Sequence, residues 1–186
     1  MAIKCKHDDS TTMYFCTFTC YQWLPLIEIV SGYDLVYKWF DYLKQQRYGV
    51  ISWVIMPNHV HTILYFPNPG FDLNKIIGNG KRFIAYDIVK RLKESSRHDI
   101  LDHLTNELTR REKRKRQLHK VFFDSFDAKG IYNAQFFNQK FNYIHLNPVR
   151  GKWQLAKDFS GYEHSSASFY ETGEVKHYEP FDYRVL

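Results

Sequence analysis

Runs of apolar and aromatic residues that contain neither Gly nor Pro predict the strands of this chain. The runs are residues 13–20 (MYFCTFTC), 50–55 (VISWVI), 59–66 (HVHTILYF) and 121–126 (VFFDSF). Aromatic and β-branched side chains favour the pleated strand surface, and the Met-Pro-Asn and PNPG segments around the third run are typical breaks. Residues 130–132 are expected to extend the fourth run as a hairpin.

Apolar residues at a spacing of three or four predict helices between these runs. We expect helices over residues 32–47, 72–93, 100–108, 134–146 and 160–170. Ser31 is placed to cap the first, with Asp34 as its capping-box partner, and Asn133 to cap the fourth. The fourth helix must end near Asn147, because Pro148 disfavours helical backbone in the residue before it. The third is expected to run on into the basic segment that follows it.

The predicted order is β-α-β-β-α-β with one further helix. This is the order of the ferredoxin-like fold, an α+β class with an antiparallel sheet and helices on one face. A chain of 186 residues is long enough for one domain with its own core. We expect a single domain over residues 1–186, with a core at about 13–150 and an extension at about 151–186. This fold hosts many activities, so function must be inferred from a site.

Composition narrows the class of protein and its compartment. Hydrophobic residues make up 44% of the chain and aromatic residues 18%, which excludes a disordered chain. Lys and Arg outnumber Asp and Glu by 26 to 20, and the net charge of +6 favours a polyanionic partner. The low, odd count of three cysteines indicates a reducing compartment. Because no apolar segment fits a membrane span or a signal peptide, we expect a cytoplasmic, nucleoid-associated protein.

His59 and His61 occupy alternate positions of the third predicted strand. Side chains alternate along a strand, so both histidines point to one face while Val60 points to the other. Two imidazoles at this spacing can chelate one divalent metal ion, with hydrogen-bond partners behind them that fix their tautomers. The alternative is a pair of surface histidines on an exposed strand face.

Tyr143 and Asn147 are four residues apart at the end of the fourth predicted helix, so they share a helix face. Lys140 and Phe136 lie on the same stripe, whereas a separate apolar stripe has the spacing of a buried side. This arrangement suits a site in which a tyrosine and an amide act together. The alternative is a tyrosine at the margin of the core and an asparagine that closes the helix.

Together, the histidine pair and the Asn147 amide oxygen form a possible three-ligand site with open coordination positions. Such a site suits Mg²⁺ or Mn²⁺ acting on a phosphate better than it suits structural zinc. Tyr143 would then lie near the phosphorus. A bound metal ion polarises the phosphate, which compensates for the weak nucleophilicity of a phenol with a free pKa of ~10. Attack by Tyr143 would give a covalent phosphotyrosine.

Six of the seven residues from 110 to 116 are cations. They are Arg110, Arg111, Lys113, Arg114, Lys115 and Arg116. As DNA contacts they would bind phosphates, adding affinity and salt dependence but no sequence specificity. The alternative is a solvated helix end or loop. Exposed aromatic side chains could in addition stack on unpaired bases.

The segment MPNHVHTIL, followed far downstream by YIHLNPVRGKW, resembles the HUH single-strand DNA transposases with one catalytic tyrosine. Within that family the chain is most similar to the REP-associated tyrosine transposases, whose genes accompany short palindromic repeats. FFDSFD and the late YEHSSASFY also fall in family order, so the resemblance covers nearly the whole chain. It implies His59 and His61 as metal ligands and Tyr143 as the nucleophile. Asn147 matches the third ligand, which is Gln in the classical insertion-sequence branch.

The resemblance implies a metal-dependent endonuclease and strand transferase that cleaves single-stranded DNA near a hairpin, leaving a 5′-phosphotyrosine and a free 3′-OH. Asn147 and the C-terminal extension favour a monomer that uses its own tyrosine, whereas the classical branch forms dimers that exchange tyrosines. Charge and placement alone add candidate DNA contacts. These are Lys140, Arg150, Lys81 and Arg82. The dense basic run at 110–120 departs from the family pattern.

Two other functions fit the same fold. A non-catalytic module that binds palindromic DNA would need neither a metal ion nor Tyr143. A metal-dependent phosphodiesterase in which water attacks would need the metal ion but would leave no covalent adduct. The residues alone do not separate these alternatives from the transposase, and a test for the covalent intermediate would.

Overall fold

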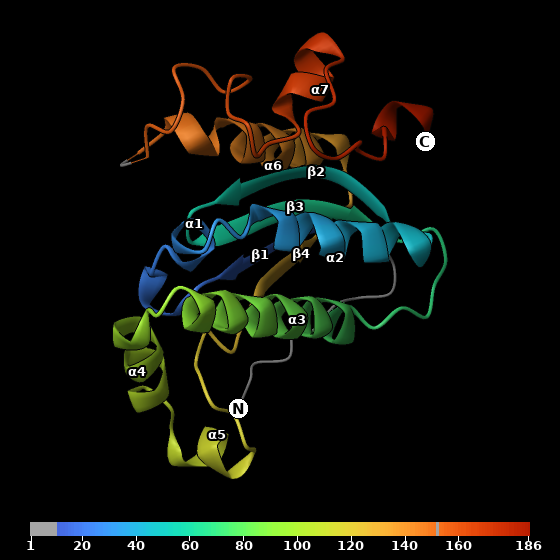
Figure 1. Cartoon of the computed structure of the whole chain (residues 1–186). Helices are drawn as coiled ribbons and strands as arrows, with labels where there is room; N and C mark the ends of the chain where they lie inside the picture. Colours follow the sequence, from blue (N-terminus) through green and yellow to red (C-terminus); the bar gives the residue numbers. More distant parts are fainter. Residues whose placement is uncertain (1–10, 152) are drawn as a thin grey trace.

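Four antiparallel strands form one sheet in the computed structural model, which describes residues 11–151 and 153–186 (Figure 1). The strands are β1 (Met13–Thr19), β2 (Gly49–Met56), β3 (His59–Tyr65) and β4 (Asp127–Gly130), in the order β2-β3-β1-β4. Helix α2 (Tyr33–Gln45) connects β1 to β2, and α3 (Leu73–Glu94) follows β3. The predicted ferredoxin-like order is therefore confirmed.

Shorter helices complete the structure. They are α1 (Leu26–Ile29), α4 (His98–Asn106), α5 (Arg110–Arg114), α6 (Ala134–Leu146) and α7 (Ala167–Thr172), with 3₁₀ turns η1 (Tyr21–Trp23), η2 (Asn147–Val149) and η3 (Tyr183–Val185). As predicted, the Asn133 side chain caps α6 by accepting a hydrogen bond from the Phe136 backbone N–H. Pro148 then ends the α-helix, and the chain continues into η2.

The sheet is covered on both faces, so the molecule has three layers (Figure 1). Helices α2 and α3 pack on the face that carries Tyr14, Cys16 and Phe18. Helix α6 and the C-terminal segment cover the opposite face, which carries Phe15 and Ile63. Every residue of β2 is buried as a result. Burial on both faces explains why the sequence of β2 is apolar throughout rather than alternating.

The fourth strand lies later in the sequence than predicted. Residues 121–126 are not a strand, and only one isolated bridge joins Phe122 to Cys20. The Lys81 ammonium donates to the backbone carbonyls of residues 123–125, at 2.6, 3.1 and 3.2 Å, so these carbonyls face a side chain of α3. Strand β4 begins at Asp127 and pairs with β1, and the hairpin predicted at 130–132 does not form.

The helix predicted to run from residue 100 into the basic segment is broken in two. Helix α4 ends at Asn106, and Thr109 starts α5 with a capping box to Glu112. The capping prediction for Ser31 was also wrong. Its φ is +48°, and no side chain caps α2.

The C-terminal segment adds contacts along the free edge of β2. Backbone hydrogen bonds join Ile55 N–H to the His164 carbonyl and Ser166 N–H to the Trp53 carbonyl, at 2.9 and 3.1 Å. The helix predicted over 160–170 is shorter than expected, because only Ala167–Thr172 is helical. Within residues 11–151 and 153–186, no helix has the length and apolar composition needed to cross a bilayer.

Candidate active site

His59 and His61 lie on β3, beneath α6, and each is only 5% exposed. Their ring centroids are 4.7 Å apart. The alternative of an exposed strand face is therefore wrong, because α6 and neighbouring aromatic rings cover this part of the sheet. Phe15 stacks on His61 at 5.6 Å, and the edge of Trp23 contacts His59 at 5.8 Å.

A hydrogen-bond partner holds each imidazole from behind. His59 Nδ1 lies 2.6 Å from Asn58 Oδ1, and His61 Nδ1 lies 2.6 Å from Thr17 Oγ1. The Asn58 amide nitrogen donates to the Trp23 carbonyl, so the amide oxygen faces His59 as an acceptor. His59 Nδ1 must then carry the proton, so Nε2 is the unprotonated nitrogen that can coordinate a metal ion. This arrangement is typical of metal-ligating histidines.

The tyrosine of α6 reaches the histidine pair. The Tyr143 hydroxyl lies 3.4 Å from His61 Nε2, and the two ring centroids are 5.0 Å apart. Helix α6 packs on β2 and β3, which fixes Tyr143 over the sheet. Tyr143 is nevertheless 43% exposed, so the residue is open to solvent.

Charge around the tyrosine is positive. Lys140 Nζ lies 4.9 Å from the ring centroid of Phe15 and 5.6 Å from that of Tyr143. Desolvation and the nearby charge of Lys129 lower the pKa of Lys140. Burial, with the charges of His59 and Lys140, holds the pKa of His61 well below its usual value of 6.5. His61 is therefore in the neutral form that a metal ion requires.

Asn147 lies one turn beyond Tyr143, where α6 passes into η2, and it is half-buried. Its side chain makes no hydrogen bond to another residue in the described part of the chain. Within the same part, no three His, Cys, Asp or Glu side chains cluster as a metal site. The nitrogen donors of His59 and His61 fit a divalent ion, and a neutral oxygen such as the Asn147 amide is the type of third ligand predicted from the sequence.

The predicted DNA contacts fall into different places. Lys140 lies at the tyrosine, and Arg150 is exposed just after η2. Arg82 and the six cations of residues 110–116 are exposed on α3 and around α5, on the other side of the sheet. Lys81 differs from the other predicted contacts, because it is buried and its ammonium donates to backbone carbonyls.

Some residues that support the site were not predicted individually. Asn58 directly precedes the His-Val-His segment, so its position was a readable signal. Thr17 lies opposite His61 in the β1–β3 register, which only the folded sheet reveals. His145 is also buried, at 4% exposed, and hydrogen-bonds to Ser166 at 2.9 Å, and burial lowers its pKa to about 4.

Comparison with solved structures supports the fold. The chain is similar to a REP-associated tyrosine transposase bound to a REP hairpin, with a TM-score of 0.62 and 17% sequence identity over 89% of this chain and 82% of that one. A proposed transposase of Deinococcus radiodurans R1 matches less well, with a TM-score of 0.43 and 13% identity over 75% of this chain and 92% of that one. No protein-family profile and no curated protein sequence matches.

Proposed function

We propose that the protein is a metal-dependent transposase that cleaves and rejoins single-stranded DNA through Tyr143. The observation that carries the proposal is the 3.4 Å separation between the Tyr143 hydroxyl and Nε2 of His61, which pairs with His59 on the same strand. A nucleophile, two oriented imidazoles and a cation converge at one partly open place. A tyrosine that only packs at the margin of the core, or two histidines without a function, would not account for this convergence.

The proposed residues have separate roles. His59, His61 and Asn147 would hold Mg²⁺ or Mn²⁺, which would polarise the phosphate and stabilise charge on its oxygens when bound. The Tyr143 oxygen attacks the phosphorus, and the bond from phosphorus to the 3′ oxygen breaks. The phenol proton is lost to solvent, and the departing 3′ oxygen takes up a proton. Lys140 stabilises the added negative charge near the tyrosine.

Energy in the 5′-phosphotyrosine ester is conserved, so the free 3′-OH can attack it and restore a phosphodiester without ATP. The similar solved structure holds a REP hairpin, and this supports single-stranded DNA with hairpins as the partner. Tyr143 and His61 approach each other within one chain, which supports a monomer acting with its own tyrosine.

Covalent capture tests the proposal. The protein is mixed with labelled single-stranded hairpins from DNA flanking its own gene, with Mn²⁺ or Mg²⁺, and run on denaturing gels. We expect a labelled protein band that EDTA and Tyr143→Phe abolish. Tyr42→Phe is a matched control, because Tyr42 is 46% exposed on α2, away from the site. Cleavage without a band that survives Tyr143→Phe would indicate a hydrolase, and binding without cleavage would indicate a non-catalytic module.

A further inference from the structure

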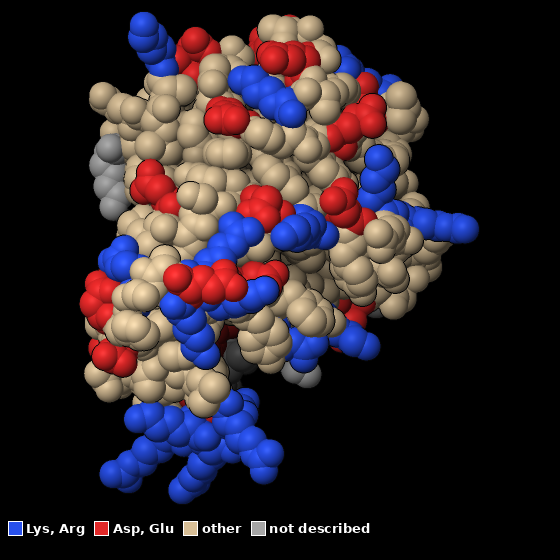
Figure 2. Space-filling view, in the orientation of Figure 1, with Lys and Arg blue, Asp and Glu red and all other residues tan. Residues whose placement is uncertain are grey.

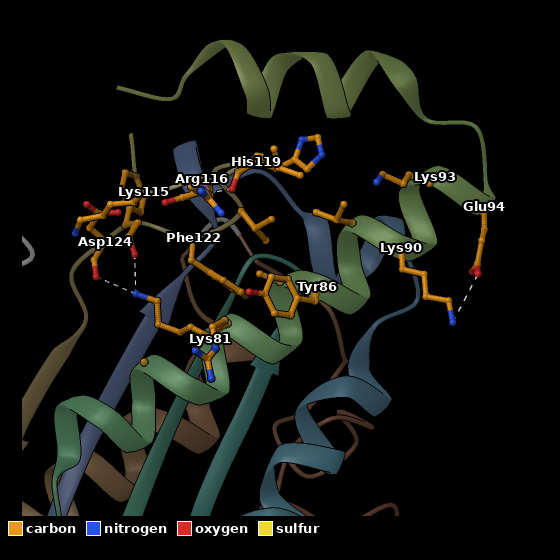
Figure 3. Close-up of a pocket in the computed structure, with 18 residues that line it drawn as sticks. Lys81, Tyr86, Lys90, Lys93, Glu94, Lys115, Arg116, His119, Phe122 and Asp124 are labelled. Atoms are coloured by element: carbon orange, nitrogen blue, oxygen red, sulfur yellow. Dashed lines mark hydrogen bonds and ion pairs between the residues drawn. The ribbon is translucent and has the colours of Figure 1, made fainter. Parts of the chain in front are cut away.

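A second concave surface lies on the α3 side of the sheet, away from Tyr143. It is a pocket of about 860 Å³ between α3 and residues 115–124 (Figure 3). Its volume is within the ~300–1,000 Å³ typical of pockets that bind organic ligands. Because α6 and α3 pack on opposite faces of the sheet, this α3 groove is separate from the candidate active site.

The wall of the α3 groove is fixed by Lys81. Its Nζ donates to the carbonyls of Phe123, Asp124 and Ser125. Figure 3 shows Lys81 reaching from α3 toward Asp124. Burial lowers the pKa of Lys81 to about 8. This lysine therefore ties residues 123–125, at one end of the groove wall, to α3.

The groove offers an aromatic surface to solvent. Tyr86 points from α3 into the groove and is 63% exposed (Figure 3). Phe83, one turn earlier, is 58% exposed, and its ring lies 6.4 Å from that of Tyr86. Buried Phe122 and half-buried Val89 add an apolar floor. Exposed rings beside an apolar floor are suited to stacking on a flat ligand.

The rim of the groove is positively charged. Its exposed cations are Arg82, Lys90, Lys93, Lys115 and Arg116. Within the described residues, only Lys90 among them forms an ion pair, with Glu94 at 3.9 Å. Asp124 is the other acid at the rim. Apart from Lys90, a polyanion would therefore find rim cations that pair with no carboxylate of residues 11–151 and 153–186.

Helix α5 extends this positive rim outward (Figure 2). Glu112, the one acid in the 110–116 run, is turned inward, where it accepts from Thr109 and pairs with Lys120 at 3.0 Å. All six cations of the run are exposed. The fold therefore buries the carboxylate of Glu112 and leaves the six positive charges of residues 110–116 exposed to solvent.

We propose that the α3 groove binds unpaired nucleotides of a DNA strand, with Tyr86 stacked on a base and with Lys93, Lys115 and Arg116 at the phosphates. The choice of DNA rests on the proposed function, and the inference adds a second strand-binding site on the far side of the sheet. An acidic peptide would satisfy the cations, but it offers no flat ring for Tyr86. The observations therefore favour a single-stranded nucleic acid.

Binding is tested by fluorescence anisotropy with the full chain in EDTA, so that no DNA is cleaved. The probes are a blunt DNA hairpin and the same hairpin with a single-stranded flank. Since base stacking is worth ~1–3 kcal/mol, we expect Tyr86→Ala to weaken binding of the flanked hairpin about 5- to 150-fold and of the blunt hairpin less than ~2-fold. Tyr86→Phe keeps the ring and should bind as the unmodified chain does, and Tyr42→Ala is the matched control.

A charge test accompanies it. Lys93→Gln/Lys115→Gln is compared with Lys44→Gln/Lys157→Gln, which removes two exposed lysines outside the groove. For single-stranded DNA, each phosphate contact contributes ~0.7 to the slope of log K against log salt concentration. The groove variant should therefore lower this slope by about 1.4, and the control variant should leave it unchanged. Thermal unfolding of each variant checks that it folds.

The proposal is overturned if Tyr86→Ala binds the flanked hairpin like the unmodified chain, or loses the blunt hairpin equally, which would indicate a duplex site. It is also overturned if the lysine variants lose binding of a polyglutamate peptide but not of DNA. The two proposals can fail independently. If no tyrosine adduct forms but the groove variants still lose binding of the flanked hairpin, the groove assignment stands and the proposed function fails. If the adduct forms and the groove variants bind the flanked hairpin normally, only the groove assignment is refuted.

Discussion

The tyrosine site and the α5 segment differ in whether their proposed functional side chains are buried or exposed. At the tyrosine site, His59 and His61 are buried, and each has a hydrogen-bond partner at 2.6 Å. In the α5 segment, the single acid Glu112 is buried and the cations around it point to solvent. Fixed, desolvated groups suit bond making, which needs geometry, whereas exposed flexible cations suit affinity, which needs only charge. The comparison predicts that the two regions can be disabled separately.

Loss of His61 should have the largest effect. His61→Ala removes a proposed metal ligand and the closest neighbour of the Tyr143 hydroxyl. We expect adduct formation to fall by roughly a thousandfold or more, since even loss of an outer partner of a ligand costs ~10–100-fold. Single-turnover capture measures the rate, and His98→Ala, an exposed histidine on α4, is the control. Near-normal adduct formation by His61→Ala would contradict the assignment of His61 as a metal ligand.

The buried acid of the α5 segment should make stability depend on pH. Burial opposes ionisation of Glu112, but hydrogen bonds from Thr109 and the charge of Lys120 outweigh it and lower its pKa to about 2. Its stabilising contribution is therefore complete above the unfolded pKa near 4.3 and is lost as the pH falls toward 2. Urea unfolding should show an advantage of about 1–3 kcal/mol over Glu112→Gln at pH 7 that shrinks by pH 2.5. Glu94→Gln is the exposed control, and parallel pH profiles for Glu112→Gln and the unmodified chain would contradict the prediction.

The residue behind His61 should matter less than His61 itself. Thr17→Val removes the hydroxyl that contacts His61 Nδ1 while keeping the shape of the side chain. We expect adduct formation or metal affinity to fall ~10–100-fold. Thr17→Ser restores the hydroxyl and should recover most of the loss. Equal behaviour of the Val and Ser variants would show that Thr17 acts by packing only.

Removal of two α5 cations should have the smallest effect on chemistry. Arg110→Gln/Arg111→Gln should leave the adduct-formation rate at saturating DNA unchanged within ~2-fold, because neither residue lies near Tyr143. The salt slope of DNA binding should fall by about 1.4 if both cations contact phosphates. Anisotropy titrations between low and moderate salt measure the slope. A changed rate at saturation would mean that the α5 segment also affects the chemical step.

Local patterns predicted the histidine pair and the tyrosine because their spacing fixes their direction. Alternation on a strand places His59 and His61 on one face, and helical spacing places Tyr143 beside Lys140. The mutual approach of the two motifs follows from the fold, since α6 packs across β2 and β3. The first three strands were also predictable from hydrophobic runs, whereas β4 (Asp127–Gly130) has no such run.

Long-range contacts account for what the sequence did not predict. Residues 121–126 have strand-like composition, but they form only an isolated bridge to Cys20, and Lys81, some forty positions earlier, binds the carbonyls of residues 123–125. His145 has the spacing of a surface residue on an isolated helix, and the C-terminal segment buries it against Ser166. Each partner is distant in the chain, so no local pattern contains the information.

The attachment of α6 has a consequence for the path of the DNA. This helix is fastened to the sheet by buried Ile144 and to the C-terminal segment by His145, so Tyr143 stands on a fixed support. In the proposed reaction a fixed support keeps the captured 5′ end in place, and strand exchange then requires the DNA to move. A hairpin held close by would raise the local concentration of one 3′ end over all others. Whether the strand is resealed or recombined would then depend on which 3′ end is held near Tyr143.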